Sequence, residues 1–241
     1  MRSTNRTLIV AFALAMATTM AASEALAEVL VLRSSGPIAQ RFRAGTMLPD
    51  VRPIRLGVND TLDLLSDTGT WSWRGPGDFP SARGAARAAS ALVAPDRRRT
   101  RVGAVRSVGG AATARPNVWM VDVAEPGAVC VLTASAPLLW RRDAEAAAVT
   151  VLASPDGGSA EVQWASGQSV ARWPAGVPVV ERATYRLTGG STAPVSIVVR
   201  ALDTPPASAP AAGMALIERG CRAQLDLLAE QMGPGDELEG S

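Results

Sequence analysis

Short apolar runs separated by turn residues are the feature that most constrains the fold of this chain. Between residues 118 and 202 the runs recur at roughly ten-residue spacing, and clusters such as Ser154-Pro155-Asp156-Gly157-Gly158 separate them. This pattern is typical of an antiparallel β-sandwich or barrel. The runs predict strands at residues 118–123, 129–133, 149–153, 162–165, 183–188 and 195–202.

A second, smaller β unit is predicted at residues 28–79. Four short runs lie there, and the last two flank the turn sequence Ser66-Asp67-Thr68-Gly69, which indicates a hairpin. Gly75-Pro76-Gly77 is expected to end the unit. The fold class is therefore predicted to be mainly β, with a small module before a larger β domain. The four runs are residues 28–33, 52–56, 61–65 and 70–74.

Residues 28–79 resemble the FecR-type extracytoplasmic domain. The resemblance rests on Gly45-x-x-Leu48-Pro49-Asp50, Ile54-x-Leu56-x-x-x-Asp60-x-Leu62-x-Leu64-Leu65-x-Asp67-x-Gly69-Thr70 and Gly75-Pro76-Gly77-x-Phe79. It implies a small β-repeat module outside the inner membrane that senses signals and contacts proteins. The best-known members also carry a cytoplasmic anti-sigma segment and a membrane helix. A predicted signal peptide replaces both here, so direct control of a sigma factor is not implied.

Residues 1–27 have the three parts of a secretory signal peptide. Arg2 and Arg6 precede an uncharged run at residues 8–20, and Ala25-Leu26-Ala27 forms a small-residue cleavage site. The run of 13 residues is shorter than the ~20 apolar residues of a spanning helix, which argues against an uncleaved anchor. We expect cleavage after Ala27, a periplasmic or secreted location, and no transmembrane segment in the mature chain.

Residues 80–117 change in composition to alanine, arginine, glycine and serine, and we expect a basic linker. Two alternatives are contact with a polyanion or membrane surface and folding back onto the chain's own acidic surface. No aromatic residues lie between the arginines, so a nucleic-acid partner is not expected. The residues assigned to polyanion contact are Arg97, Arg98, Arg99 and Arg101.

One helix is predicted at residues 213–232. Its apolar residues fall at spacings of three and four, which places them on a single face. Gly233-Pro234-Gly235 is expected to end the helix, and residues 233–241 are predicted to be a disordered acidic tail. The apolar face consists of Met214, Ile217, Cys221, Leu225, Leu228 and Met232.

The chain has two cysteines, Cys130 and Cys221. An even number in an exported chain favours a disulfide, which would clamp the C-terminal helix onto the β domain. Two buried free thiols are the alternative. Two thiolates are too few for a structural zinc site, and neither a metal nor a cofactor is expected.

The chain contains no histidine, and all 24 of its basic residues are arginine. This composition excludes catalytic sites that require histidine or lysine, and it excludes histidine-ligated zinc or haem. The string Asp67-Thr68-Gly69-Thr70 matches the aspartic-peptidase turn, but that chemistry needs two carboxylates and the chain has one such string. Asp-Thr-Gly is also ordinary hairpin chemistry. An atypical aspartic peptidase therefore remains only a second alternative.

Trp140 and Trp173 lie next to arginines at the ends of predicted strands. We expect most of the six tryptophans to lie in the core and these two to be the exposed pair, with contact to a ligand as their candidate role. The favoured hypothesis is an exported, non-enzymatic interaction or scaffold module that binds a protein or an envelope component. The sequence specifies neither the partner nor the oligomeric state.

Overall fold

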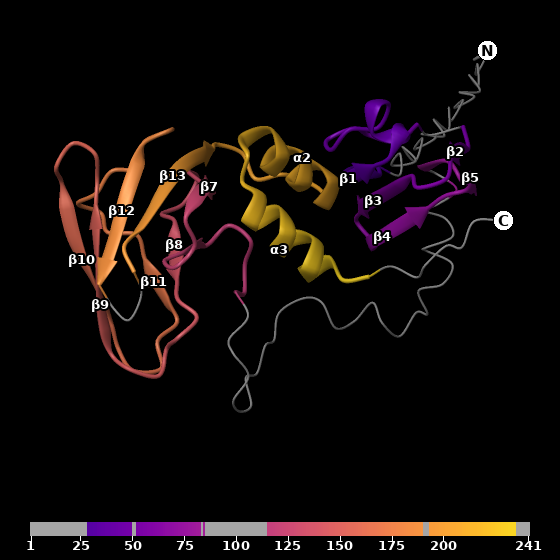
Figure 1. Cartoon of the computed structure of the whole chain (residues 1–241). Coiled ribbons are helices and arrows are strands. Elements are labelled where there is room, and N and C mark those ends of the chain that lie inside the picture. The colour runs from indigo at the N-terminus through magenta and orange to yellow at the C-terminus, as the bar shows by residue number, and fades with distance from the viewer. Residues whose placement is uncertain (1–27, 50–51, 83, 85–114, 190–192, 235–241) are drawn as a thin grey trace, which may run out of the picture.

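The computed structural model describes residues 28–49, 52–82, 84, 115–189 and 193–234. It is mainly β, with several sheets and two C-terminal helices, which confirms the predicted fold class. Within these ranges the sheets do not close into a barrel. Figure 1 shows three parts in a row, with the small N-terminal β unit and the large β unit on either side of the two helices.

The N-terminal unit contains the predicted β3–β4 hairpin, in which Ser66 pairs with Gly69. Gly75-Pro76-Gly77 does not end the unit, because the chain turns there and forms a further strand, β5, that pairs with β2. The order of the main sheet is β1-β3-β4. The elements are β1 (Leu30–Ser35), the 3-10 helix η1 (Pro37–Gln40), β2 (Ile54–Leu56), β3 (Thr61–Ser66), β4 (Gly69–Arg74) and β5 (Gly77–Phe79).

One face of this sheet forms its own small core, because alternate side chains of a strand point to the same side. Leu62 and Leu64 of β3 are fully buried there with Trp73 of β4, and the Trp73 ring stacks on Phe79 at 5.1 Å between centroids. Ala82 belongs to the same core. The start of the predicted linker, residues 80–82, therefore packs with the module.

The large unit consists of two sheets that share one core. Most strand pairs are antiparallel as predicted, but β13 pairs with β7 in parallel and β6 with β8 in parallel. The strand orders are β10-β9-β12-β13-β7 and β11-β8-β6. The strands are β6 (Val121–Asp122), β7 (Gly127–Leu132), β8 (Leu138–Trp140), β9 (Ala148–Ala153), β10 (Ser159–Trp164), β11 (Val170–Arg172), β12 (Thr184–Gly189) and β13 (Val195–Leu202).

The prediction of one continuous helix at residues 213–232 is wrong, because two helices occupy this segment. These are α2 (Ala209–Arg219) and α3 (Arg222–Met232). The Ser208 hydroxyl caps α2 by accepting from the amide of Ala211, so the helix begins before the predicted start. Gly220, at φ 72°, takes the left-handed conformation that ends helices. The apolar spacing continues across this break, which explains why the sequence pattern did not reveal it.

The two helices pack against both β units. A third core combines Leu30 and Leu65 of the N-terminal sheet with Cys130 of β7 and with Leu216 and Leu225 of the helices. The approach to the N-terminal sheet is close, since a Cβ atom on Gly213 would lie 2.7 Å from Leu30 Cδ2. The C-terminal helix was predicted to pack only within the domain at residues 118–232. The two helices instead join this domain to the N-terminal module.

Several predictions concern residues outside the described ranges. The signal peptide at residues 1–27, most of the linker and residues 235–241 of the predicted tail are among them. Gly233 and Pro234 of that tail are described, and both lie beside Thr70 of β4. Neither described helix combines the length and the apolar character needed to cross a membrane.

Candidate functional site

The predicted disulfide is confirmed. Cys130 and Cys221 are bonded, with their Cα atoms 5.9 Å apart, and both are fully buried. Cys130 lies on β7, which is the outermost strand of its sheet. It is buried because α2 and α3 pack over that side. The bond therefore joins the edge of the large β unit to the start of α3.

Trp140 and Trp173 are 1% and 5% exposed, so the prediction that they are the exposed tryptophans is wrong. Trp173 packs edge-on against Tyr185 and donates its indole N–H to the carbonyl of Val177 at 2.7 Å. Residues 170–172 form the short strand β11, which the sequence pattern did not indicate, and it carries Trp173 into the core. Trp173 is enclosed in the core, whereas Trp140, although itself buried, borders a hollow beside α3.

Arg97, Arg98, Arg99 and Arg101 lie outside the described residues. Asp67, the candidate peptidase residue, lies in the turn between β3 and β4 and accepts a hydrogen bond from the amide of Ala209 at 2.7 Å. Ala209 is the first residue of α2, where unpaired amides favour a carboxylate partner. This contact gives Asp67 a structural part in holding the helix to the N-terminal unit.

Two of the sheet edges are covered. Beside β1, residues 45–48 run along the strand, and the Val31 amide donates to the Thr46 carbonyl at 2.9 Å. Beside β7, the side chain of Gln224 on α3 accepts from the Cys130 amide and donates to the Cys130 carbonyl. An exposed strand edge invites pairing with another chain, and these contacts prevent it.

Among the described residues, the edge of β4 is unpaired over most of its length. In an antiparallel pair, alternate residues direct their backbone groups away from the partner strand. Thr70 is one of these outward residues, because its amide donates to the Gly233 carbonyl at 3.0 Å. By the same alternation, Ser72 and Arg74 also direct their backbone N–H and C=O groups outward. These groups have no hydrogen-bond partner among the described residues.

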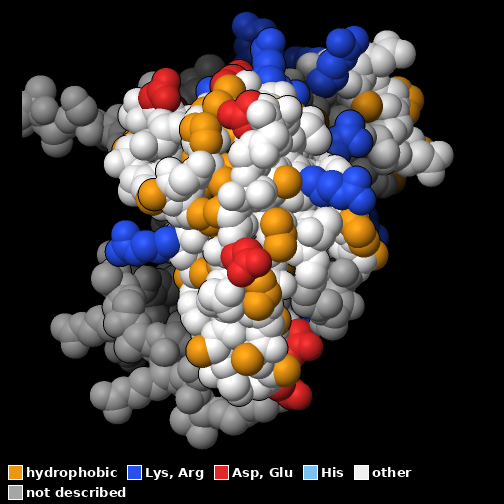
Figure 2. Space-filling model, turned by 90° about the vertical axis from the view of Figure 1, so that its left-hand side faces the viewer, with side chains coloured by type: hydrophobic (Ala, Val, Ile, Leu, Met, Phe, Trp, Pro, Cys, Tyr) orange, Lys and Arg blue, Asp and Glu red, His pale blue; other side chains and the backbone are white. Residues whose placement is uncertain are grey.

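β10 is also the outermost strand of its sheet, but its edge carries a charged side chain. Glu161 is exposed on it, and a charge on an edge strand opposes further pairing. Figure 2 views the end of the molecule formed by the large β unit, where apolar side chains are scattered among charged ones. The β4 edge differs because a hollow lies beside it.

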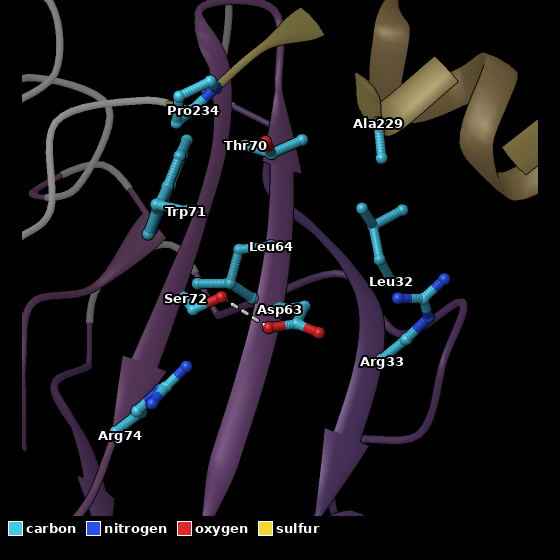
Figure 3. Close-up of a pocket in the computed structure, with 10 residues that line it drawn as sticks. All are labelled: Leu32, Arg33, Asp63, Leu64, Thr70, Trp71, Ser72, Arg74, Ala229 and Pro234. Carbon is cyan, nitrogen blue, oxygen red and sulfur yellow. Dashed lines mark hydrogen bonds between the residues drawn. The ribbon is translucent and has the colours of Figure 1, made fainter. Parts of the chain in front are cut away.

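That hollow has a volume of about 590 Å³ and lies between the N-terminal sheet and the end of α3 (Figure 3). Its floor is polar. The Ser72 hydroxyl donates to Asp63 at 2.6 Å, and Arg33 pairs with Asp226 of α3. The lining residues are Leu32, Arg33, Asp63, Leu64, Thr70, Trp71, Ser72, Arg74, Ala229 and Pro234.

Arg33 and Arg74 are both exposed cations of this hollow, but Arg33 is paired with Asp226, whereas none of the described residues forms an ion pair or hydrogen bond with the Arg74 guanidinium. The hollow thus offers the hydroxyls of Thr70 and Ser72, the Asp63 carboxylate and a guanidinium that is unpaired among the described residues, which are groups that recognise a polar ligand. Within the described ranges no three His, Cys, Asp or Glu side chains converge as metal ligands. The arrangement fits recognition better than proton transfer or nucleophilic attack.

Comparison with protein-family models, with curated proteins and with solved structures finds no match.

Proposed function

We propose that this protein is an exported, non-enzymatic interaction module that binds an extended segment of a partner protein at the β4 edge. The observation that carries the proposal is the pair of outward-facing residues Ser72 and Arg74, whose backbone groups are unpaired within the described structure. An added strand would satisfy these groups, and pockets for its alternate side chains would supply selectivity.

The chain's own contact at Thr70 supports this binding mode. Thr70 and Pro234 form a parallel bridge, and both the amide and the hydroxyl of Thr70 donate to the Gly233 carbonyl. The edge thus already pairs with one extended segment over a short distance. A partner strand would continue along Ser72 and Arg74.

The hollow beside the edge indicates which partner side chains are favoured. Side chains of an added strand alternate between its two faces, so every second one would point toward the hollow. Arg33 is already paired with Asp226, whereas Arg74 is not paired within the described ranges. We therefore expect a partner segment with an acidic side chain near Arg74.

The location of this binding outside the cytoplasm is part of the same proposal. The signal-peptide pattern at residues 1–27 and the buried Cys130–Cys221 disulfide are compatible with export. The resemblance of residues 28–79 to the FecR-type domain implies protein contact in the cell envelope. It remains a prediction, and it covers the same strands that form the open edge.

The proposal is tested with extended peptides selected against the mature protein from a displayed random library. Ser72→Pro removes the outward N–H at a position where an edge strand tolerates proline. Ser72→Ala is the matched control, since it loses the hydroxyl but keeps the N–H. Glu161→Pro tests the corresponding position on the β10 edge. Peptide affinity is measured by titration calorimetry for each folded variant.

We expect Ser72→Pro to weaken binding at least tenfold and the two controls to bind within about threefold of the wild type. In the wild type, peptide binding should slow hydrogen exchange at the amides of Ser72 and Arg74. Unchanged affinity of Ser72→Pro, or protection of β10 in place of β4, would show that the β4 edge is not the binding site.

A further inference from the structure

A second hollow, of about 570 Å³, lies between α3 and the strands β6 and β8. Arg115 lines it at the point where the chain enters the large β unit. The same hollow contains Arg142, whose guanidinium lies 6.0 Å from the centre of the Trp140 ring. Its volume falls in the range of small-molecule sites.

Arg115 is a buried cation with unused donors. It is 8% exposed, and its side chain makes one long hydrogen bond, from Nη1 to the Met120 carbonyl at 3.4 Å. No carboxylate of the described residues lies within ion-pair distance of it. Because Arg115 lines the hollow, its remaining guanidinium donors can meet a molecule bound there.

Arg141 shows how this protein satisfies a buried arginine when the role is structural. It is also 8% exposed, but it donates to the carbonyls of Gln168, Ala165 and Ala144 at 2.8, 2.9 and 3.4 Å. Its guanidinium also lies over the Trp164 ring. Within the described ranges Arg115 has no such set of acceptors, so the contacts described there do not account for its burial.

The backbone holds Arg115 in position while its side chain stays unsatisfied. The Arg115 carbonyl accepts from Gln231 Nε2 of α3 at 2.8 Å. Burial lowers the pKa of the Arg115 guanidinium, and the charges of Asp122 and Glu125 offset part of this effect. A guanidinium stays protonated in proteins, so its desolvation is compensated by hydrogen-bond acceptors, as at Arg141, or by an anionic partner.

The carboxylates around the hollow restrict the kind of ligand. Asp122, Glu125 and Glu230 line it together with Asp226, which is already paired with Arg33. A simple anion would meet Arg115 but would be repelled by the other three carboxylates. A ligand that carries both a carboxylate and cationic groups would complement all of these charges.

We infer that this hollow binds a basic amino acid, free or as the C-terminal residue of a short peptide. The ligand's carboxylate pairs with Arg115, whose planar fork suits two parallel hydrogen bonds to a carboxylate. The ligand's ammonium and side-chain cation lie toward Asp122, Glu125 and Glu230. This site is separate from the β4 edge and does not depend on its role.

The inference is tested by titration calorimetry of the protein from Glu28 to Ser241 with L-arginine and with the tripeptide Gly-Gly-Arg. Agmatine, which is arginine without its carboxylate, and norleucine, which lacks the side-chain cation, are the matched ligand controls. We expect agmatine and norleucine to bind at least tenfold more weakly than the better of the two arginine ligands. Which of those two binds more tightly distinguishes a free amino acid from a peptide end.

Arg115→Met keeps most of the side-chain volume and should reduce arginine binding to the level of agmatine. Arg55→Met, at the exposed position of β2, is the control and should bind as the wild type does. If Arg115→Met does not fold, the comparison of the arginine ligands with agmatine and norleucine on the wild-type protein still tests the inference. Equal binding of arginine and agmatine, failure of both arginine ligands to bind, or unchanged binding by a folded Arg115→Met would overturn the inference.

Discussion

The side-chain amide of Gln224 pairs with the backbone of Cys130 as a neighbouring strand would. Gln224 Oε1 accepts from the Cys130 amide at 2.6 Å, and Nε2 donates to the Cys130 carbonyl at 2.8 Å and to the Val118 carbonyl at 2.7 Å. Gln224 is 1% exposed. One buried glutamine thus completes the edge of the five-stranded sheet next to the disulfide.

Gln224→Leu should therefore lower the free energy of unfolding by about 3 kcal/mol, because it leaves three buried backbone groups without partners. Urea unfolding followed by tryptophan fluorescence measures the change. Gln163→Leu, at an exposed position on β10, is the control and should change the free energy by no more than about 0.5 kcal/mol. Equal stability of the Gln224→Leu variant and the wild type would contradict this account of the edge.

The disulfide is expected to stabilise the fold without taking part in binding. It closes a 91-residue span, for which the chain-entropy model gives about 4–5 kcal/mol, with smaller values common in practice. The double variant Cys130→Ala/Cys221→Ala should lose about 2–5 kcal/mol of unfolding free energy. Thiol titration of the denatured, unreduced wild type should detect no thiol, and two thiols per chain would disprove the bond.

Gly75 lies where the chain passes close to the turn before β3. A Cβ atom there would overlap the carbonyl oxygen of Gly57 and lie 2.9 Å from the Cβ of Leu56. Gly75→Ala should therefore cost about 2–3 kcal/mol of unfolding free energy, in the range of overpacked sites. Gly176, which has no atom within 4 Å of the corresponding position, is the control. Thermal unfolding of Gly176→Ala should match the wild type, and an equally stable Gly75→Ala variant would show that the backbone moves apart without cost.

Asp156 provides a prediction for pH dependence. Hydrogen bonds from the Ser154 hydroxyl and the Gly158 amide hold the pKa of this exposed carboxyl below its ordinary value. Because the folded pKa is depressed, its contribution to stability is present above the ordinary aspartate pKa of about 3.9 and disappears as the pH falls through the folded pKa. Carboxyl carbon NMR should show Ser154→Ala raising the pKa of Asp156. An unchanged pKa of Asp156 in Ser154→Ala would show that the Ser154 hydroxyl is not the main cause of the lowered pKa.

Export is tested by the mass of the protein recovered after secretion. We expect Glu28 as the first residue, since Ala25-Leu26-Ala27 forms the cleavage site. Intact mass spectrometry distinguishes this product from the full chain. Retention of residues 1–27 would contradict both the cleavage and the proposed location.

Local patterns in the sequence predicted the strands and the hairpin, because these depend on residues that are close together in the chain. The β3–β4 hairpin follows from apolar alternation on both sides of a turn, and β9, β12 and β13 were predicted in the same way. The strands β5, β8 and β11 were not identified, since three residues are too few to show a period of two, whereas the equally short β2 was found only because Ile54 and Leu56 lie in the apolar run at residues 52–56.

The candidate sites were much less predictable, because they depend on contacts between distant residues. Composition assigned Arg115 to a solvated linker, yet the packing of α3 against the large β unit buries it. Nothing in the local sequence indicated that Gln224 would cover β7, 94 residues away, while the β4 edge would stay open. These features depend on where α3 lies, and the apolar spacing predicts a helix without specifying what it packs against.

The position of α2 and α3 between the two β units also sets an order of folding during synthesis. Leu30 and Leu65 belong to the same buried cluster as Leu216, which is made more than 150 residues after them. Until residues 209–232 have left the ribosome, the helix-facing leucines of the N-terminal sheet have no partner surface. The nascent chain is therefore expected to remain incompletely folded, and open to chaperones or to a translocation channel, until its last helices emerge.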